Sequence, residues 1–200
     1  MCVVESTKAA IAANQIAVTT SEQQLRAYVT ARELAVVAHR RPATPGAYIQ
    51  IEGPVHTYGI CAVLRNSGRT PATKVTVNVS CQKLPKPLPR DFAFADSDLF
   101  GYGVIGPEGD MFTPIIRINA TEFEQIDDVS DWYLWGWVEY DDVFSGTLRH
   151  RTEFCFQSDR LRLPTTNEFG YTFRAHSRFN AVEADCMRPI DPHTNRSGAE

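Results

Sequence analysis

Side chains of the kind used in acid–base chemistry gather in one stretch of this sequence. Glu139, Asp141 and Asp142 lie within four residues of one another, and His150 follows soon after, between two arginines. Glycoside hydrolases use two carboxylates that face each other across a cleft, so these residues define one candidate activity, glycan hydrolysis by Glu139 with Asp141 or Asp142. The alternative interpretation is cross-strand pairing of these carboxylates with the two arginines on an exposed hairpin. We favour charge pairing and assign no catalytic residue.

The other groups suited to metal or cofactor chemistry form no recognised pattern. His176, Cys186 and His193 have suitable side chains for a metal, but their spacing matches no known site. The sequence has no glycine-rich phosphate loop, no nucleophile elbow and no His-Glu-x-x-His stretch. We therefore expect no metal and no cofactor.

The five cysteines leave the redox state open. Their odd number requires at least one unpaired thiol in a monomer, and none forms a Cys-x-x-Cys pair. Cys61 and Cys81 lie on two neighbouring strand-like segments, so a disulfide between them is geometrically conceivable in an oxidising compartment. The alternative, which we favour, is that both are small buried hydrophobic residues.

Most of the chain has the composition of short β-strands. From Leu25 onward, runs rich in Val, Ile, Thr and aromatic residues alternate with Gly, Pro, Asn and Asp. Because no crossover helices separate these runs, we predict an all-β fold, an immunoglobulin-like antiparallel β-sandwich with an N-terminal helical arm and one short helix. The short helix is expected over residues 122–129, with Thr121 as its N-cap. The expected strands are residues 27–38, 47–51, 57–65, 73–82, 111–119, 133–143, 148–157 and 171–176.

The start of the chain differs from the rest. It is rich in Ala, Gln, Ser and Thr, and Val4, Ile11, Val18 and Leu25 recur every seven positions, which predicts a helix with one thin apolar stripe. At the other end, many polar residues and two prolines predict disorder. We expect three parts: a helical stalk or docking arm (1–24), the β-sandwich domain (25–180) and a disordered tail (181–200).

An aromatic hairpin is expected in the middle of the sheet. Ser145 and Gly146 mark its turn. A two-residue turn there places Trp137 opposite Phe154. We expect Trp135 and Trp137 to pack in the core, with Trp132 at the start of the strand less constrained, and the alternative is an exposed aromatic strip that binds sugars or a protein. A slip of one residue would change every pairing and turn each side chain to the other face.

Four short stretches carry the identity of the chain. They are Leu25-Arg-Ala-Tyr-Val29, Asn66-Ser-Gly-Arg-Thr-Pro-Ala72, Gly136-Trp-Val-Glu-Tyr-Asp-Asp-Val-Phe144 and Arg151-Thr-Glu-Phe-Cys155. In the second, Asn66 and Gly68 are suited to left-handed backbone conformations, and Ala72 leaves room for a close strand crossing. We interpret the following as structural family-motif residues: Asn66, Gly68, Thr70, Pro71, Ala72, Tyr140, Asp142, Phe154 and Cys155.

Together these stretches resemble a family of uncharacterised proteobacterial proteins over residues 20–160. Members of that family usually carry a hydrophobic membrane helix and an Ala-rich stalk before the Arg-Ala-Tyr segment, which implies a place in the cell envelope. This sequence has the stalk-like segment but not the membrane helix. The Asn-x-Gly-x-Thr-Pro-Ala stretch is also similar to a strand crossing in bacterial immunoglobulin-like adhesion modules.

The amino-acid composition argues against two classes of binding partner, nucleic acids and membranes. The 200 residues carry 20 Lys and Arg against 24 Asp and Glu, a formal net charge of −4, which lacks the basic excess that nucleic-acid binding needs. The longest apolar stretch, residues 34–38, is too short to span a bilayer, so membrane contact would need an anchor absent from this chain. By itself the chain has the features of a soluble protein.

A specified scaffold without a convincing catalytic site favours a non-enzymatic interaction or structural module associated with the bacterial envelope, whose partner is a protein. Glycan hydrolysis is the first alternative. The second, carriage of a lipid or small ligand between the sheets, requires a cavity lined by aromatic residues. The oligomeric state is open.

Overall fold

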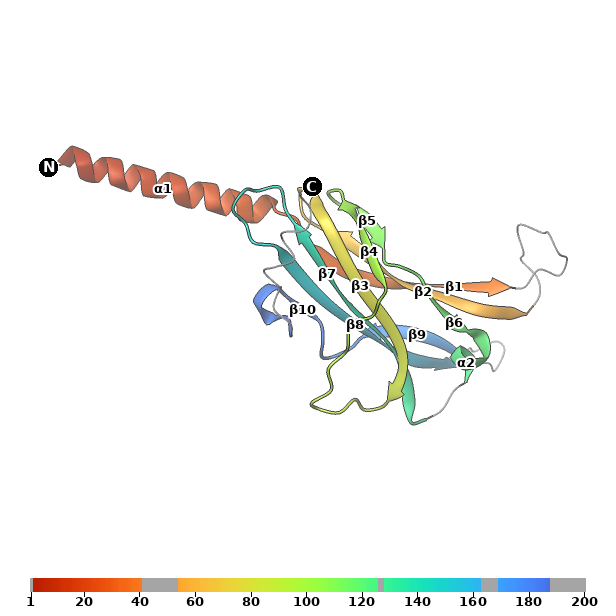
Figure 1. Ribbon diagram of the computed structural model, residues 1–200. Helices are drawn as coiled ribbons and strands as arrows, with labels where there is room; N and C mark the ends of the chain where they lie inside the picture. Colours follow the sequence, from red (N-terminus) through yellow and green to blue (C-terminus); the bar gives the residue numbers. More distant parts are fainter. Residues whose placement is uncertain (1, 41–53, 126–127, 163–168, 188–200) are drawn as a thin grey trace.

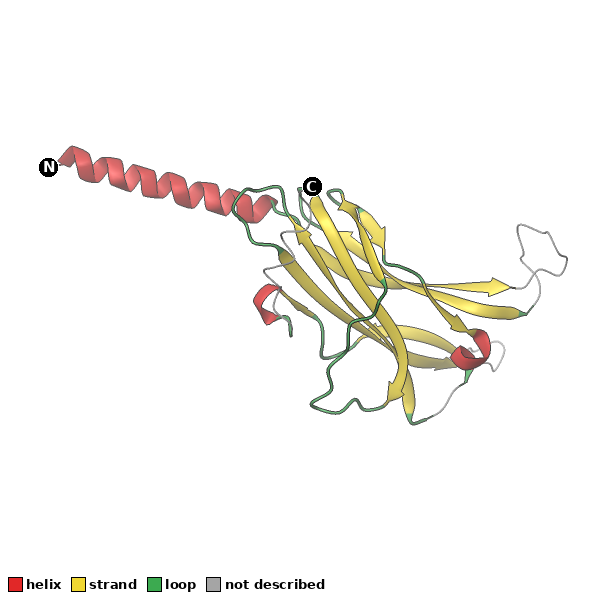
Figure 2. Ribbon diagram, in the orientation of Figure 1, coloured by secondary structure: helices red, strands yellow, loops and turns green. Residues whose placement is uncertain are grey.

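The computed structural model describes residues 2–40, 54–125, 128–162 and 169–187 (Figure 1). This part of the chain is mostly β-structure in two antiparallel sheets, with one long and one short α-helix (Figure 2). The elements are α1 (Cys2–Leu25), β1 (Val29–Arg40), β2 (Val55–Asn66), β3 (Ala72–Pro85), β4 (Phe100–Ile105), β5 (Asp110–Phe112), β6 (Ile116–Asn119), α2 (Ala120–Glu124), β7 (Ser130–Asp141), β8 (His150–Arg162), β9 (Phe169–Ala175), β10 (Ala181–Val182) and a 3-10 turn, η1 (Glu183–Asp185).

The strands divide into a four-stranded and a six-stranded sheet. The first has the order β1-β2-β5, with β6 also paired to β2, and the second has the order β10-β8-β7-β3-β4, with β9 also paired to β8. Every pairing is antiparallel. This confirms the predicted antiparallel, mostly β architecture.

The two sheets share one hydrophobic core. Ile60 and Leu64 of β2 are fully buried in it, as is Val138 of β7. The valines at alternate positions of β3 line the same core, as their period of two predicts. They are Val75, Val77 and Val79.

Strand boundaries differ from expectation between β3 and β7. The single strand expected over residues 111–119 is two strands, because the chain is interrupted at Pro114, which has no N–H to donate. The neighbouring Thr113 hydroxyl instead accepts a hydrogen bond from the backbone N–H of Ala62 (3.0 Å). Strand β4 was not expected at all. The strand expected over residues 47–51 lies outside the described residues.

The short helix begins two residues earlier than expected. Asn119, rather than Thr121, is its N-cap, because the Asn119 side chain accepts a hydrogen bond from the Thr121 N–H (2.9 Å) from an extended backbone. The helix ends at Glu124.

The hairpin between β7 and β8 has a longer loop than expected. Trp137 lies opposite Glu153, and Phe154 lies opposite Gly136, one residue away from the expected register. Asp142 is the cause, because its Oδ1 atom accepts hydrogen bonds from the Phe144 N–H (2.9 Å) and the Thr147 hydroxyl (2.6 Å) and so closes a wide loop.

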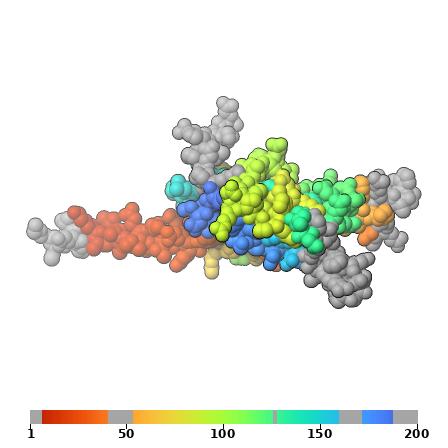
Figure 3. Space-filling view, turned by 90° about the horizontal axis from the view of Figure 1, so that it is seen from below, coloured from red at the N-terminus to blue at the C-terminus, as the bar shows by residue number. Residues whose placement is uncertain are grey.

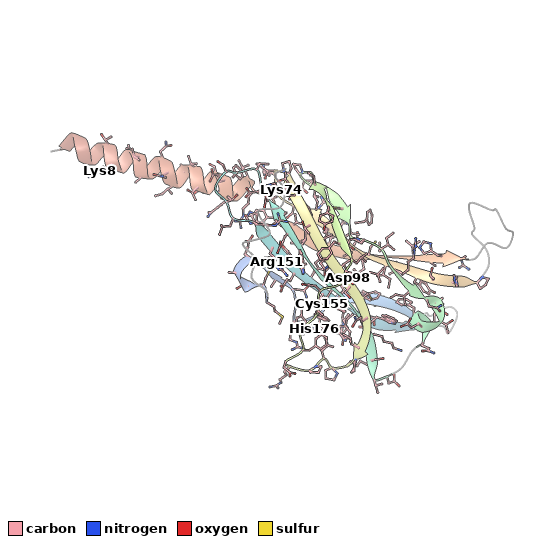
Figure 4. All side chains as sticks on the ribbon, viewed as in Figure 1. Lys8, Lys74, Asp98, Arg151, Cys155 and His176 are labelled. Carbon is pink, nitrogen blue, oxygen red and sulfur yellow. The ribbon has the colours of Figure 1, made fainter. Side chains whose placement is uncertain are left out.

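The helix α1 projects from the two-sheet domain as an arm (Figure 1). Its 24 residues correspond to a length of about 36 Å. Ile11, Ile16 and Val18 on the arm remain 51–67% exposed, and Lys8 lies far from the sheets (Figure 4). The predicted helical arm is therefore present, and its apolar side chains have no cover among the described residues.

The tail expected to be disordered from residue 181 is ordered in its first part. Ala181 and Val182 pair with Glu153 and Thr152 of β8, and η1 follows them. Residues 188–200 lie outside the described residues.

The four cysteines with described side chains are free thiols, so the conceivable bridge between Cys61 and Cys81 is not formed. These two residues lie on strands of different sheets. Cys155 is fully buried, and burial raises the pKa of its thiol to about 12. A neutral, buried thiol is unreactive, so Cys155 has a packing role.

Candidate functional site

Several family-motif residues meet where the arm joins the domain. Asn66 is fully buried, and its Oδ1 atom accepts hydrogen bonds from the N–H groups of Tyr28 (3.1 Å) and Gly68 (2.9 Å). Its Nδ2 group donates to the carbonyl oxygens of Thr70 (2.8 Å) and Ile105 (3.2 Å). One side chain thus connects the segment between the arm and β1, the turn after β2 and the end of β4.

Gly68 allows the turn to pass against the arm. A Cβ atom at this position would lie 2.2 Å from the carbonyl oxygen of Arg26 and 2.6 Å from the Cα atom of Ala27. The expected left-handed backbone is wrong for both Asn66 and Gly68, since neither has a positive φ angle. The need for glycine is steric.

The six-stranded sheet also binds residues 27–29, the segment that joins the arm to the four-stranded sheet. The Tyr140 hydroxyl accepts a hydrogen bond from the Val29 N–H (3.2 Å) and donates to the Ala27 carbonyl oxygen (3.4 Å). The Thr152 hydroxyl donates to the Val29 carbonyl oxygen (2.7 Å). Burial raises the pKa of Tyr140 to about 12, so its hydroxyl stays neutral. We call Ala27, Tyr28, Val29, Asn66, Gly68, Tyr140 and Thr152 the arm-base cluster.

The remaining motif residues have separate positions. Ala72 and Phe154 are buried in the core between the sheets, whereas Cys155 points to the opposite face of its sheet. Thr70 and Pro71 are half-buried in the turn before β3. These positions agree with packing roles, and they do not form a common site.

The predicted cluster of acid–base residues is divided by the six-stranded sheet. Glu139 lies opposite Arg151 on the outer face, and Tyr140 lies opposite His150 on the inner face. Glu139 and Asp141 therefore share one face, while Asp142 contacts His150 on the other. The structure does not bring these four residues into one site.

Glu139 is the centre of a buried ion-pair network on the outer face. Its carboxylate oxygens accept hydrogen bonds from Arg151 Nη1 (2.7 Å) and Arg149 Nε (3.2 Å). Arg149 also contacts Asp141 (3.0 Å), and both arginine side chains are less than a tenth exposed. The predicted charge pairing is therefore present, but it is buried rather than solvated.

His150 lies between two carboxylates. Its Nδ1 atom is 2.8 Å from Glu183 Oε1, and its Nε2 atom is 3.0 Å from Asp142 Oδ2. Hydrogen bonding to Glu183 raises the pKa of His150 against the opposing effect of burial, and Asp142 adds to the rise. Burial would raise the pKa of Asp142, but hydrogen bonds from Thr147, Phe144 and His150 together lower it.

These shifts predict a pH-dependent stability. Because the pKa of His150 is raised on folding, its contribution is complete below its ordinary value of 6.5 and is lost as pH rises through the folded pKa. We expect the free energy of unfolding, measured with urea between pH 6 and 9, to fall with a slope that His150→Gln reduces. Exposed His56 offers the control, His56→Gln. An equal slope in wild-type protein and His150→Gln would show that His150 does not change its protonation on unfolding.

A long connection covers the outer face of the six-stranded sheet. Residues 86–99, which we call the strap, run from β3 to β4 and lie beside the segment that follows β9 (Figure 3). Arg178 of that segment donates hydrogen bonds to the carbonyl oxygens of residues 88–90. Asn78 fastens the strap, donating to the Ser97 carbonyl oxygen (2.7 Å) and accepting from the Ser97 N–H (3.1 Å). Leu88 of the strap is buried against the sheet, although a proline-rich stretch favours an exposed connector.

Between strap and sheet lies an aromatic pocket of about 190 Å³. Phe94 of the strap stacks on Trp135 with ring centroids 4.2 Å apart. The indole N–H of Trp137 donates to Asp96 (2.9 Å), and the guanidinium of Arg151 lies 4.5 Å from the Trp137 ring centroid. Figure 4 shows Arg151 on β8, the strand that forms part of the pocket floor. Trp135 and Trp137 thus pack on the outer face of the sheet rather than in the core between the sheets, whereas Trp132 is buried in that core.

A row of large apolar side chains continues from this pocket. Phe100, Tyr102 and Val104 of β4, which we call the β4 row, are 42%, 75% and 64% exposed. The intervening Gly101 packs inward, where a Cβ atom would lie 2.9 Å from Val77 Cγ1. Phe100 contacts Trp137 edge-on with centroids 6.1 Å apart, so the row and the pocket form one continuous surface.

Sequence reasoning missed this surface. The signal is the stretch Phe100-Gly-Tyr-Gly-Val104, in which large apolar residues alternate with glycine. Because glycine disfavours strands, the sequence does not predict β4. Only the packing of Gly101 against Val77 and Pro114 shows which face of β4 is exposed.

Comparisons with protein-family models, curated proteins and solved structures find no match. Within the described ranges, no three His, Cys, Asp or Glu side chains are arranged to hold a metal ion, and His193 lies outside those ranges. No helix in the described part of the chain is long and apolar enough to cross a membrane.

Proposed function

We propose that this protein is a non-enzymatic binding module that recognises another protein through the outer face of its six-stranded sheet. The observation that carries the proposal is the β4 row, three large apolar side chains exposed side by side on a regular strand. Exposed apolar surface that adjoins a pocket is typical of protein-binding sites, where aromatic side chains contribute most of the affinity.

The chemistry of the surface favours an apolar ligand. Most polar groups at the pocket are paired within the chain, because Arg151 Nη1 contacts Glu139 (2.7 Å), Arg151 Nε lies 3.4 Å from Glu153, and Asp96 accepts a hydrogen bond from Trp137 (2.9 Å). A ligand therefore gains mainly by covering aromatic and aliphatic surface. A protein partner can place one apolar side chain in a pocket of about 190 Å³ and cover the β4 row with its neighbours.

The type of β-sandwich and the cellular location of the protein are part of the same proposal. We infer an immunoglobulin-like sandwich carried on the arm α1 at the bacterial cell envelope. Two antiparallel sheets around one core support the sandwich, and the arm-base cluster supports a firmly held arm. The envelope location rests on the resemblance to the proteobacterial family.

No specific observation favours the hydrolase alternative. Glu139 is enclosed by two arginines, and Asp142 lies on the other face of the sheet. Neither Glu139, Asp141 nor Asp142 is part of the aromatic pocket.

A photo-cross-linking amino acid at position 102 tests the proposal in cells that express the protein natively. We expect discrete protein adducts at Tyr102 and at least tenfold fewer adducts at Leu148, because a bound partner excludes water from the β4 row but not from the hairpin loop. Leu148 is a matched control since it is an apolar side chain with 85% exposure. Equal adducts at the two positions would contradict the proposed surface.

A further inference from the structure

The segment of residues 181–187, which we call the latch segment, is attached to the strand β8. It begins with the two-residue strand β10, which pairs with β8 (Figure 1). At its other end, the Met187 N–H donates a hydrogen bond to Glu153 Oε2 (2.7 Å). Between these two attachments, Oε1 of Glu183 lies 2.8 Å from Nδ1 of His150. This contact joins the latch segment to the first residue of β8.

Both ring nitrogens of His150 face carboxylate oxygens. Nδ1 is 2.8 Å from Glu183, and Nε2 is 3.0 Å from Asp142. A neutral imidazole carries one N–H and one lone pair, so it can donate to one ionised carboxylate only and would turn its lone pair toward the other. The protonated ring donates to both. The arrangement is therefore that of a charged His150 between two carboxylates.

The two carboxylates differ in how firmly they are held. The Asp142 side chain is fully buried and also accepts hydrogen bonds from the Phe144 N–H and the Thr147 hydroxyl. The Glu183 side chain is 40% exposed, and its φ angle of +54° lies in the left-handed region, which is strained for a residue other than glycine. When the contact with His150 is lost, Glu183 can enter water and relax its backbone. Release therefore takes place at Glu183 rather than at Asp142.

The other charged or titratable groups near His150 do not replace this contact. The ring of Tyr140 packs against His150 with centroids 5.2 Å apart, and burial raises the pKa of Tyr140 to about 12, so it stays neutral. The flanking Arg149 and Arg151 belong to the ion-pair network on the outer face of the sheet. Hydrogen bonding to Glu183 raises the pKa of His150, so the charged form is favoured while the segment is attached.

We propose that His150 and Glu183 form a pH-dependent latch, which holds residues 181–187 on β8 at low pH and releases them when His150 loses its proton. Met187 lines the aromatic pocket, and residues 180–182 line a cavity of about 520 Å³ between β1 and β8. Release therefore opens this cavity and removes one wall of the pocket. The inference does not rest on the proposed function, because Glu183 and His150 belong neither to the β4 row nor to the aromatic pocket.

Hydrogen–deuterium exchange of the full chain, corrected for the intrinsic effect of pH, measures the release. We expect the protection factors of residues 181–187 to fall at least tenfold between pH 6 and pH 9, because the neutral ring loses one of its two carboxylate partners. They are also expected to stay at least tenfold below those of β7 at each pH, since the segment opens locally. Protection that is independent of pH, or equal to that of β7, would overturn the proposal.

Two variants separate the latch from other effects of pH. Glu183→Ala is expected to lower the protection of residues 181–187 at least tenfold at pH 6 and to leave it nearly independent of pH. Asp185→Ala, which removes an exposed carboxylate from the same turn, is the matched control and is expected to behave like wild type. Circular dichroism verifies that each variant is folded. A Glu183→Ala variant with the protection and pH dependence of wild type would also overturn the proposal.

Discussion

Replacement of Asn66 by alanine is expected to lower the free energy of unfolding by about 3–5 kcal/mol. The substitution removes both the acceptor for the Tyr28 and Gly68 N–H groups and the donor to the Thr70 and Ile105 carbonyl oxygens. The side chain is fully buried, so water cannot replace these hydrogen bonds without opening the turn. Each buried polar group that loses its partner costs about 1–3 kcal/mol, and some relaxation reduces the sum.

Urea denaturation followed by tryptophan fluorescence measures this effect. Ser67→Ala is the matched control, because the neighbouring Ser67 is exposed and its hydroxyl makes one long hydrogen bond to Tyr28 (3.4 Å). We expect this control to change stability by about 0.5 kcal/mol or less. An Asn66→Ala variant within 1 kcal/mol of wild type would show that the arm-base cluster does not depend on this side chain.

Removal of the Glu139 carboxylate is expected to have an effect of similar size. Glu139→Ala leaves two buried guanidinium groups without their shared partner, and breaking a buried ion pair from one side costs about 3–5 kcal/mol. Arg149 retains Asp141 at 3.0 Å, and Arg151 retains only the longer contact with Glu153 at 3.4 Å. Thermal and urea unfolding measure the change directly.

An exposed ion pair provides the comparison for Glu139. Glu108 lies 2.9 Å from Arg65, but its side chain is 64% exposed, so Glu108→Ala is expected to cost less than about 1 kcal/mol. A structural role predicts that Glu139→Ala destabilises much more than Glu108→Ala. Equal, small effects of the two substitutions would contradict the structural role of Glu139. A functional role of its carboxylate would then have to be considered again.

The strands with clear alternation were predictable from sequence. Val75, Val77 and Val79 have a period of two and line the core, because a strand with one buried face needs apolar residues only at alternate positions. The arm was also predictable, since its Ala-rich composition favours a helix regardless of tertiary contacts. These features depend on local properties of the chain.

The features that depend on distant contacts were not predictable. The Asp142 side chain lengthens the hairpin loop and shifts the register by one residue, which a turn motif alone does not reveal. The β4 row is concealed by its glycines, which are required by the packing of the neighbouring strand. The motif residues Asn66 and Tyr140 were recognised, but their common contact with the residues that join the arm to β1 is formed only when both sheets are in place.

Quantitative co-purification with a surface variant and its matched control tests the central proposal most directly. Wild-type protein, Tyr102→Asp and Leu148→Asp are tagged identically and isolated after mild cross-linking from cells that express the chain natively. The proposed binding surface predicts a protein that is recovered equally with wild type and Leu148→Asp and at least tenfold less with Tyr102→Asp, because a buried aspartate in an apolar interface leaves an uncompensated charge. Recovery of the same proteins in equal amounts with all three would contradict the account.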